Sequence, residues 1–377
     1  TSNHEHFGAL TAALLAERMG WSGTPVQAVL ACQHKLYARR VLQEVAPEAN
    51  VKFQRLDAHY NGPVPQGIAY PQYVKPVKAA FSVLAKTVHN HADLHAHTRF
   101  GPWELWVIRH LVEPFERVAR QRLPQAGTAH AMLLEEPIHA PQFNLDGYVF
   151  NGQVRALGVV DEVMYPGTDA FMRFDYPSRL SHTVQQRALA VAQRFLNAVG
   201  YSHGLFNMEF FYNAKTDKLT VIEFNPRMAS QFSDLYRRVH GTNLHEVAFA
   251  LAHGIDPAHL PRQLPTAHCA SSFVYRSFDP KATVAMPSQV AKAQFWEEFP
   301  DALLFEFPKL PGQIERDFKW LRSYRYGIVH LGAANPDELR TRCEKASAIL
   351  GWEVPYALTS KAETPFCRAE PTTLSQY

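Results

Sequence analysis

Apolar residues recur with helical spacing in several stretches of this 377-residue chain, and in other stretches they alternate with polar residues. A stripe of apolar residues every three or four positions is typical of an amphipathic helix, whereas strict alternation is typical of a half-buried strand. The pattern predicts helices at 8–20, 25–45, 103–122, 181–199, 231–253 and about 336–350. It predicts strands at 69–77, 132–136, 143–150, 154–160, 206–212, 219–225, 271–279 and 323–332. Mixed elements over this length indicate an α/β (α+β) chain of two or three lobes.

Two predicted strands on either side of Thr216 are joined by a short polar turn and form a hairpin. Because the turn centres near Thr216, we expect Glu209 to lie opposite Glu223. Side chains alternate between the two faces of a strand, so Asn225 and Arg227 should project from the same face as Glu223. The hairpin therefore predicts two facing carboxylates with an amide and a guanidinium beside them.

Facing carboxylates repel each other and raise each other's pKa unless a cation lies between them. Oxygen ligands on a rigid strand pair, with room for phosphate oxygens, are typical of a magnesium–nucleotide site. We therefore predict Glu209, Glu223 and Asn225 as ligands of Mg²⁺, with Mn²⁺ as an alternative metal. A solvated edge hairpin with incidental charges is the other reading, and Ile222 and Phe224 argue against it because they mark a buried strand.

The segments Phe206-Asn-Met-Glu209 and Glu223-Phe-Asn-Pro-Arg227 resemble the metal-binding motif of the ATP-grasp enzymes. This family includes D-alanine–D-alanine ligase, biotin carboxylase and L-amino-acid ligases. Three further segments are similar to family motifs and follow in the family's order: Gln33-His-Lys35, Tyr73-Val-Lys75 with the loop through Ser82, and Leu134-Glu-Glu-Pro-Ile138. Four motifs in order, over roughly residues 20–255, are a more specific signal than one motif alone.

The resemblance implies a role for each matching residue. It implies that Lys35 and Lys75 contact the phosphates, with Ser82 in the loop that lies over the triphosphate. It implies that Glu135 contacts the adenine amine, and that the backbone of Glu136 and Ile138 supplies the remaining adenine contacts. Arg227, Lys75 and Lys35 are the implied catalytic residues.

The chain departs from the family pattern at two places. The family usually has glycines in the phosphate loop, and this chain has none between Lys75 and Gly101. Seven residues after Glu135 the family usually places a glutamate that holds the ribose hydroxyls, and this chain has Gln142. An amide can both donate and accept, so Gln142 is still expected to contact the ribose.

The resemblance also implies the architecture, an ATP-grasp fold in which two α+β lobes enclose MgATP. Only the end of the family's N-terminal Rossmann-like lobe precedes Lys75, so that lobe is expected to be truncated or reduced. The implied divisions are 1–65 for the end of that lobe and a linker helix, 66–150 for the small lobe, 151–260 for the large lobe with the metal site, and 261–377 for a C-terminal α+β portion and tail.

Two other groups of residues are candidates for binding. Arg276 and Arg325 lie on the last two predicted strands and are candidate contacts for a substrate carboxylate, with structural salt bridges as the alternative. The histidines at 89, 91, 95 and 97 could hold a transition metal, although alternating histidines on a polar segment are more often solvated.

Composition narrows the class of protein. Hydrophobic residues at 46% and charged residues at 19% are ordinary for a globular protein, and a net charge of +3 without a basic stripe argues against nucleic-acid binding. No apolar run is long enough to span a membrane. Four scattered cysteines predict reduced thiols and a cytoplasmic location. The oligomeric state stays open, a homodimer included.

The sequence thus predicts an ATP-dependent ligase that activates a carboxylate as an acyl phosphate and joins it to an amine, with an amino acid or peptide as substrate. Two alternatives remain. One is a biotin-carboxylase-like enzyme, which would need a separate carrier because no biotin-carrier motif occurs in the chain. The other is a non-catalytic ATP-binding protein.

Overall fold

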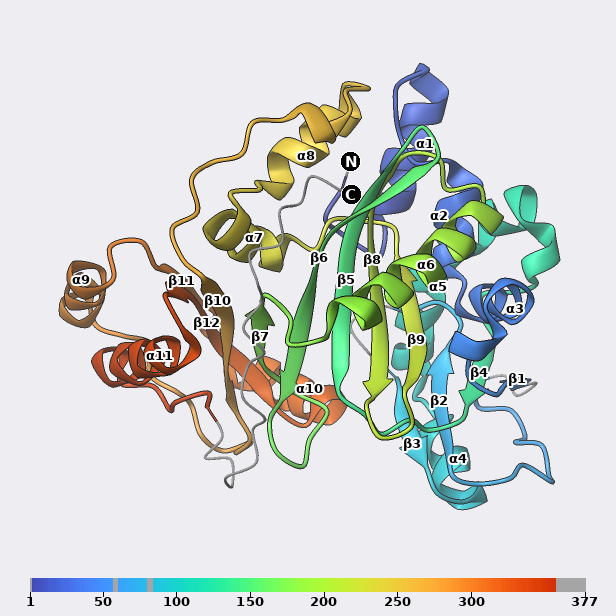
Figure 1. Cartoon of the computed structure of the whole chain (residues 1–377). Helices are drawn as coiled ribbons and strands as arrows, with labels where there is room; N and C mark the ends of the chain where they lie inside the picture. The colour runs from blue at the N-terminus through green and yellow to red at the C-terminus, as the bar shows by residue number, and fades with distance from the viewer. Residues whose placement is uncertain (1, 57–59, 80–83, 357–377) are drawn as a thin grey trace.

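The computed structural model describes residues 2–56, 60–79 and 84–356, which form two antiparallel sheets with helices packed around them (Figure 1). The small sheet has the strand order β1-β4-β2-β3, and the large sheet has the order β11-β12-β10-β7-β6-β5-β8-β9. The strands are β1 (Phe53–Leu56), β2 (Gln72–Pro76), β3 (Lys86–Val88), β4 (Met132–Glu135), β5 (Gln142–Phe150), β6 (Gln153–Met164), β7 (Phe171–Tyr176), β8 (Gly204–Asn213), β9 (Lys218–Asn225), β10 (Cys269–Ser277), β11 (Leu303–Glu306) and β12 (Tyr324–Ala333).

The helices are α1 (Gly8–Met19), α2 (Val26–Gln33), α3 (Lys35–Val45), α4 (His91–His97), α5 (Pro102–Arg122), α6 (His182–Ala198), α7 (Ser233–His240), α8 (Leu244–Ala252), α9 (Gln289–Glu298), α10 (Pro311–Leu321) and α11 (Pro336–Leu350). Each predicted helix and strand has a counterpart among these elements. Two of the predicted helices, however, are broken in the structure.

The helix predicted at 25–45 is interrupted at His34, whose backbone turns to φ −90° and ψ 86° between α2 and α3. The break lets the backbone N–H of Lys35 donate to the carbonyl of Val77, 3.1 Å away, just beyond β2. His34 caps the new helix, because its Nδ1 accepts from the N–H of Tyr37 at 3.2 Å. The interruption therefore places Lys35 at the start of α3, against the strand that carries Lys75.

The helix predicted at 231–253 is interrupted at Gly241, which has a φ of +67° and separates α7 from α8. A Cβ atom at this position would lie 1.8 Å from the carbonyl oxygen of Gln263, so the close approach of the two backbones requires glycine. The apolar pattern continues through the break and gives no sign of it.

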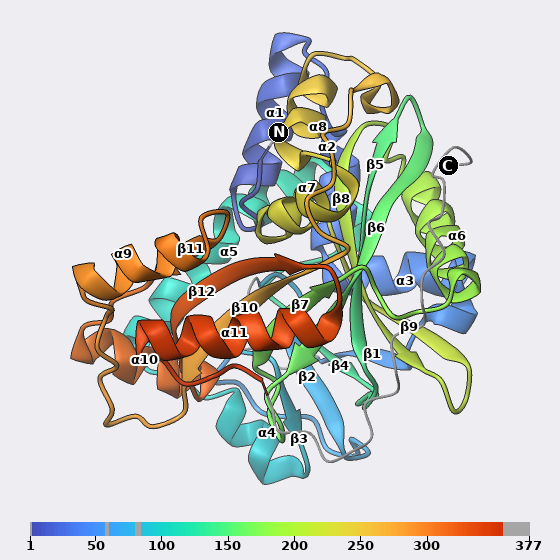
Figure 2. The same cartoon turned by 60° about the vertical axis from the view of Figure 1, so that its left-hand side comes forward.

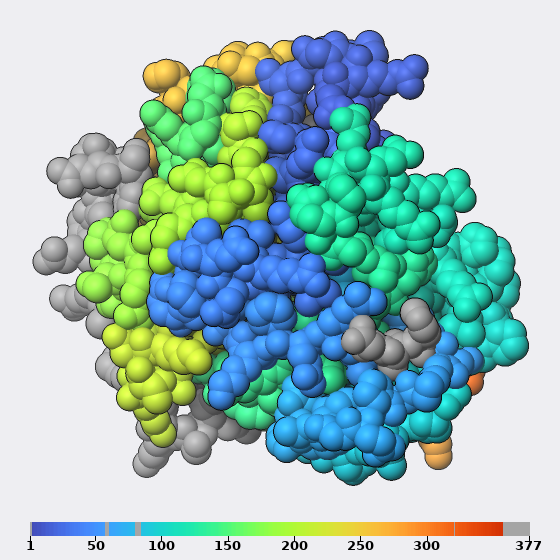
Figure 3. Space-filling view, turned by 90° about the vertical axis from the view of Figure 1, so that its right-hand side faces the viewer, coloured from blue at the N-terminus to red at the C-terminus, as the bar shows by residue number. Residues whose placement is uncertain are grey.

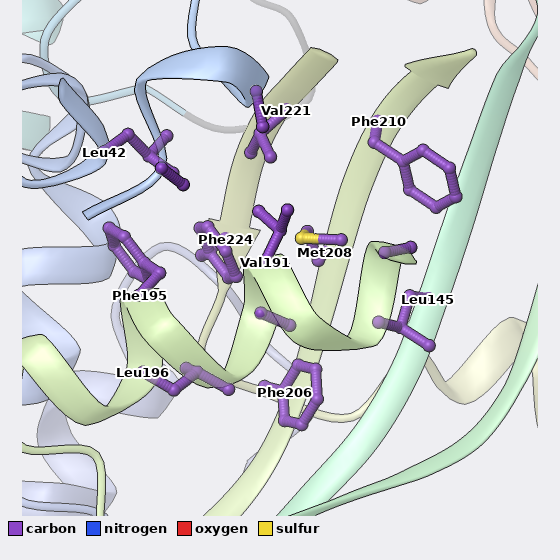
Figure 4. Close-up of a cluster of buried hydrophobic side chains, with 14 of the residues drawn as sticks. Leu42, Leu145, Val191, Phe195, Leu196, Phe206, Met208, Phe210, Val221 and Phe224 are labelled. Atoms are coloured by element: carbon purple, nitrogen blue, oxygen red, sulfur yellow. The ribbon is translucent and has the colours of Figure 1, made fainter. Parts of the chain in front are cut away.

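One face of the large sheet packs against α6 (Figure 4). Leu145, Phe206, Met208, Phe210, Val221 and Phe224 of the strands meet Val191, Phe195 and Leu196 of the helix, all of them buried. The rings of Phe195 and Phe224 are stacked, with centroids 3.9 Å apart. Burying side chains of this size stabilises the fold by roughly 1.5–3 kcal/mol each. This core holds β5, β8 and β9 rigidly from behind, and α11 covers β10 and β12 farther along the sheet (Figure 2).

The opposite face of the large sheet is divided between a second core and a polar region. Helices α7 and α8 cover part of it, and Tyr236 and Leu235 pack there against Tyr148, Val160 and Phe174. Next to this core the alternate positions of β5, β8 and β9 carry amides and carboxylates instead of apolar side chains. The small sheet faces this polar region.

Helices α2 and α3 lie where the two sheets meet, and Figure 3 shows their segment between the part of the chain around α6 and the part around α5.

Strand β5 pairs with β6 and β8, so it belongs to the large sheet. The division predicted after residue 150 therefore falls inside a hairpin of one sheet. The segment 136–141, between β4 and β5, is the better boundary between the lobes.

In the described ranges, no helix is both long and apolar enough to cross a membrane. Cys32, Cys269 and Cys343 are free and buried, in agreement with the predicted reduced thiols, and Cys367 lies outside the described residues.

Candidate active site

A cavity of about 540 Å³ lies between the small sheet and the polar face of the large sheet. Its walls include most of the residues that the sequence singled out. These are Lys35, Lys75, Glu135, Glu136, Ile138, Gln142, Glu209 and Glu223. Segments that are far apart in the chain thus meet at one site, as the four sequence motifs predicted. Ser82 lies outside the described residues, so its predicted contact stays a prediction.

The predicted pairing of Glu209 with Glu223 is confirmed by the register of β8 and β9. A β-bulge follows immediately, because Phe210 pairs with Val221 and leaves Ile222 without a partner. The interpretation of Ile222 as a buried strand residue was wrong, because its side chain is partly exposed and lines the cavity at the bulge. Phe224 is buried as expected.

The two carboxylates differ in their partners. Glu223 forms an ion pair with Lys35, and the positive charges of Lys35 and Lys75 lower its pKa although burial acts in the opposite direction. Burial and the neighbouring charge of Glu223 raise the pKa of Glu209 to about 7, against the opposing effects of Arg227 and Lys35. Burial and Glu223 therefore favour the protonated form of Glu209, and a cation bound between the two carboxylates would favour its ionised form.

Asn225 lies behind the pair and is 3% exposed. Its Nδ2 donates to Glu209 Oε1 at 3.0 Å and to Asn207 Oδ1 at 3.1 Å, which uses both hydrogens of the amide. Its Oδ1 is thus left as an acceptor. Two carboxylates and one amide oxygen fit Mg²⁺, which takes few protein ligands and completes its shell with phosphate oxygens and water. Across the described residues no three His, Cys, Asp or Glu side chains converge on a metal position, so these residues would depend on such additional ligands.

Lys75 is buried at the end of β2, and its ammonium lies 2.8 Å from Glu135 Oε2. Burial lowers the pKa of Lys75 to about 8, although Glu135 acts in the opposite direction. Glu135 is buried, yet Arg39 and Lys75 bring its pKa down to about 2. Lys75, the predicted phosphate contact, and Glu135, the predicted adenine contact, therefore form a buried ion pair with each other.

Arg39 is a site residue that the sequence analysis missed. Its Nε donates to Glu135 Oε1 at 2.6 Å, and its two Nη atoms donate to the carbonyls of Val221 and Ile222 at 2.7 and 3.0 Å. These carbonyls belong to the bulge of β9, so Arg39 joins α3 to both sheets. An arginine spaced four residues after Lys35 on one helix face was the signal that could have revealed it.

The hinge 136–141 supplies Glu136 and Ile138 to the cavity wall, as the resemblance implied. Gln142 follows at the start of β5, and its Nε2 donates to Glu209 Oε2 at 3.3 Å. Gln142 therefore contacts one of the predicted metal ligands in addition to lining the cavity.

Glu162 on β6 is a second site residue that no sequence motif indicated. It is buried in the same cavity wall. Burial, followed by the charge of Glu209, raises the pKa of Glu162 well above its usual range.

Arg227 lies just beyond the end of β9, outside the cavity wall. Its Nε is 3.2 Å from Glu5 Oε2, and Gln33 Nε2 donates to Glu5 Oε1 at 2.8 Å. The guanidinium of Arg227, which was predicted to contact a phosphoryl group, is thus paired with the carboxylate of Glu5. No sequence motif had singled out Glu5. The charge of Arg227 still reaches Glu209, whose pKa it lowers against the larger effects of burial and Glu223.

The remaining candidates lie away from the cavity wall. Arg276 and Arg325 are paired across β10 and β12, where Arg276 donates to Ser323 and Arg325 lies over the ring of Phe307. Three of the four histidines considered as metal ligands lie in α4 (His91–His97), and two of these contact backbone carbonyls.

Comparison with known proteins agrees with this geometry. The profile of the ATP-grasp domain matches residues 68–234. Carnosine synthase 1 from Gallus gallus is 28% identical over 271 residues, which is 68% of this chain and 27% of that protein. The chain therefore spans about a quarter of the length of this relative.

Two solved structures show the fold. An L-amino acid ligase from Bacillus licheniformis has a TM-score of 0.66 at 14% identity, over 90% of this chain and 77% of that one. A biotin carboxylase from Campylobacter jejuni in complex with β,γ-ATP has a TM-score of 0.58 at 16% identity, over 90% and 72%. The chain thus has the ATP-grasp fold, and its residues 68–234 are a domain of the ATP-grasp family.

Proposed function

We propose that the chain binds MgATP in the cavity between its sheets and uses it to join a carboxylate to an amine. One observation carries the proposal. A single cavity brings the facing carboxylates Glu209 and Glu223 together with the ammonium groups of Lys35 and Lys75, while the hinge 136–141 forms another part of its wall. Acidic metal ligands and basic phosphate ligands in one cavity are what a metal–triphosphate requires.

The residues divide the work of binding among them. Glu136 and Ile138 present their backbone to the adenine, and Lys75 and Lys35 neutralise phosphate oxygens. Glu209, Glu223 and Asn225 would hold Mg²⁺, which would withdraw negative charge from the phosphates. The ion pair with Glu223 holds Lys35 at the cavity wall, beside the proposed position of the phosphates.

The chemistry has two steps. A carboxylate oxygen of the substrate attacks the γ-phosphorus, the bond to the β–γ bridging oxygen breaks, and ADP leaves. The amine nitrogen then attacks the carbonyl carbon of the acyl phosphate, phosphate leaves, and the amine loses one proton. Lys75, Lys35 and Arg227 contribute fixed positive charge where negative charge develops, so catalysis comes mainly from position and electrostatics.

An amino acid or short peptide is the proposed substrate class. The name of the Gallus gallus relative states that it makes carnosine, and the Bacillus licheniformis structure is of a ligase for L-amino acids. Both names support ligation of amino acids, and the residues that would select among them stay unassigned.

ADP release measured with pairs of amino acids, with dipeptides and with bicarbonate tests the proposal. We expect release that depends on a carboxylate and an amine together, and hydroxylamine should trap the acyl phosphate as a hydroxamate. The two amino acids that make up carnosine are the first pair to test. No ADP release with any pair, from folded protein that binds ATP, would contradict a ligase.

The two alternatives give different results in the same assays. A biotin-carboxylase-like enzyme would release ADP with bicarbonate only after biotin or its carrier is added, and the fold shared with the Campylobacter jejuni enzyme keeps this test necessary. A non-catalytic protein would be stabilised against heat by ATP without releasing ADP from any mixture.

A further inference from the structure

Behind the carboxylate pair, a chain of buried polar side chains crosses four neighbouring strands. It runs from Glu162 on β6 through Asn144 and Asp146 on β5 to Asn207 on β8 and Asn225 on β9, and each is at most 5% exposed. Buried amides in such numbers require mutual hydrogen bonds, because an unpaired one costs about 1–3 kcal/mol. The directions of these bonds determine how Asn225 is oriented.

Asn207 is the centre of the chain. Its Nδ2 donates one hydrogen to Asp146 Oδ1 at 3.0 Å and the other to Asn144 Oδ1 at 2.8 Å. Both hydrogens of the amide point toward β5, so the Oδ1 of Asn207 faces β9. There it accepts from Asn225 Nδ2 at 3.1 Å, and the second hydrogen of that amide goes to Glu209 Oε1.

Asp146 gives this chain its direction, because both of its oxygens are acceptors here: Oδ1 accepts from Asn207 Nδ2 and Oδ2 accepts from the hydroxyl of Tyr236. It therefore requires the nitrogen end of Asn207, which in turn presents its oxygen to Asn225 and requires the nitrogen end of that residue. If Asn225 were reversed, its Oδ1 would face Asn207 Oδ1 and Glu209 Oε1, two acceptors. The observed orientation leaves Asn225 Oδ1 accepting no hydrogen bond from any side chain in the described ranges.

We propose that Asp146 and Asn207 are positioning residues, which orient Asn225 so that its amide oxygen, and not its nitrogen, faces the metal. The inference rests on the proposed function, because it assumes a cation at Glu209 and Glu223. It adds a requirement that the sequence motif does not contain, since Asp146 lies 79 positions before Asn225 in the chain. Outer hydrogen-bond partners of this kind fix the orientation of a metal ligand, and losing one typically lowers the affinity for the metal by about 10- to 100-fold.

Titration of the full chain with Mn²⁺ in saturating ADP, with free Mn²⁺ measured by electron paramagnetic resonance, tests the proposal. Asn207→Leu keeps the branched shape of the side chain and removes both ends of the amide, so it should weaken Mn²⁺ binding by about 10-fold or more. Asp146→Asn can present either end, and we expect a loss of roughly 3- to 10-fold. Tyr275→Phe is the matched control: it also removes one buried hydroxyl, but that hydroxyl is hydrogen-bonded to Ser347, 2.9 Å away and outside this chain of side chains, so Mn²⁺ affinity should stay within about twofold.

Affinity for ADP without metal should be the same in all four proteins. This control distinguishes weaker metal binding from damage to the nucleotide site. A folded Asn207→Leu variant with wild-type Mn²⁺ affinity would overturn the proposal. The same holds if the variant has a lower melting temperature but an unchanged Mn²⁺ affinity. If Asn207→Leu does not fold, wild-type Mn²⁺ affinity in Asp146→Leu, which removes the acceptor of Asn207 Nδ2, overturns it instead. Failure of the unmodified protein to bind Mn²⁺ with ADP would contradict the proposed function itself, and it is seen before any variant is made.

Discussion

Glu209 and Glu223 face each other across β8 and β9, but only Glu223 of the two has an ammonium group as its ion-pair partner among the described residues. Glu209 instead accepts hydrogen bonds from the neutral amides of Asn225 and Gln142. Burial and Glu223 raise the pKa of Glu209 to about 7, while Lys35 keeps Glu223 ionised. Burial and Glu223 therefore oppose the ionisation of Glu209, and a cation at the pair would favour it.

Glu209→Gln should stabilise the metal-free protein in a pH-dependent way. The pKa of Glu209 rises from 4.5 to about 7 on folding, so the folded state binds more protons in this window and stability falls as pH rises through it. The gain from the variant should be small at pH 4 and complete above pH 7, as measured by melting temperature without metal. An equal gain at both pH values would contradict the raised pKa.

Glu223→Gln should abolish ADP formation and leave the fold intact, because this carboxylate is a proposed metal ligand and forms an ion pair with Lys35. Glu344→Gln on α11 is a matched control, since Glu344 is exposed and lies outside the cavity wall. Turnover near that of the unmodified protein in a stable Glu223→Gln variant would remove Glu223 from the site.

Lys75→Ala should weaken ATP by about 10- to 100-fold, the range for losing a hydrogen bond to a charged group. Lys86→Ala is the control, because Lys86 lies on the neighbouring strand β3, is exposed and does not line the cavity. Isothermal titration with a non-hydrolysable ATP analogue measures both. Equal affinities in the two variants would show that Lys75 serves only its ion pair with Glu135.

Gln142→Glu separates two roles of this residue. A ribose contact alone would hold or improve ATP affinity in the variant. The structure adds the hydrogen bond to Glu209, and a new carboxylate there would raise the pKa of Glu209 further. We therefore expect weaker Mn²⁺ binding near pH 6.5 that recovers as the pH is raised, and unchanged Mn²⁺ affinity at every pH would contradict the contact.

Arg39→Met should destabilise the fold by about 3–5 kcal/mol, because it leaves the buried carboxylate of Glu135 with one partner and exposes two strand carbonyls to an apolar neighbour. Arg40→Met is the control, since Arg40 is adjacent but exposed. Urea unfolding of both variants measures the difference. A loss below about 1 kcal/mol, the value typical of surface pairs, would contradict the role of Arg39.

The sequence predicted those parts of the fold and site that depend on local pattern. The position of one turn was enough to predict that Glu209 lies opposite Glu223. The order of the four motifs predicted the fold. The break at His34 was not predictable, because it depends on a contact with Val77, which is distant in the chain. The break at Gly241 had a local signal that was overlooked, a C-cap glycine two residues before the N-cap Asn243.

The same limit applies to the site residues that were missed. Glu5, Arg39 and Glu162 reach the site from segments without a recognisable motif, and their importance comes from buried partners that only tertiary structure reveals. Ile222 was assigned to the wrong environment because a bulge changes the alternation of faces by one residue, which a strand pattern does not show.

Arg39 has a consequence for the nucleotide cavity. One buried guanidinium holds Glu135 on the small sheet and two carbonyls on the large sheet, so the lobes are pinned together at the α3 edge. Any movement that parts the two sheets at this edge has to break all three of these hydrogen bonds together, so Arg39 couples the stability of the fold to the width of the nucleotide cavity.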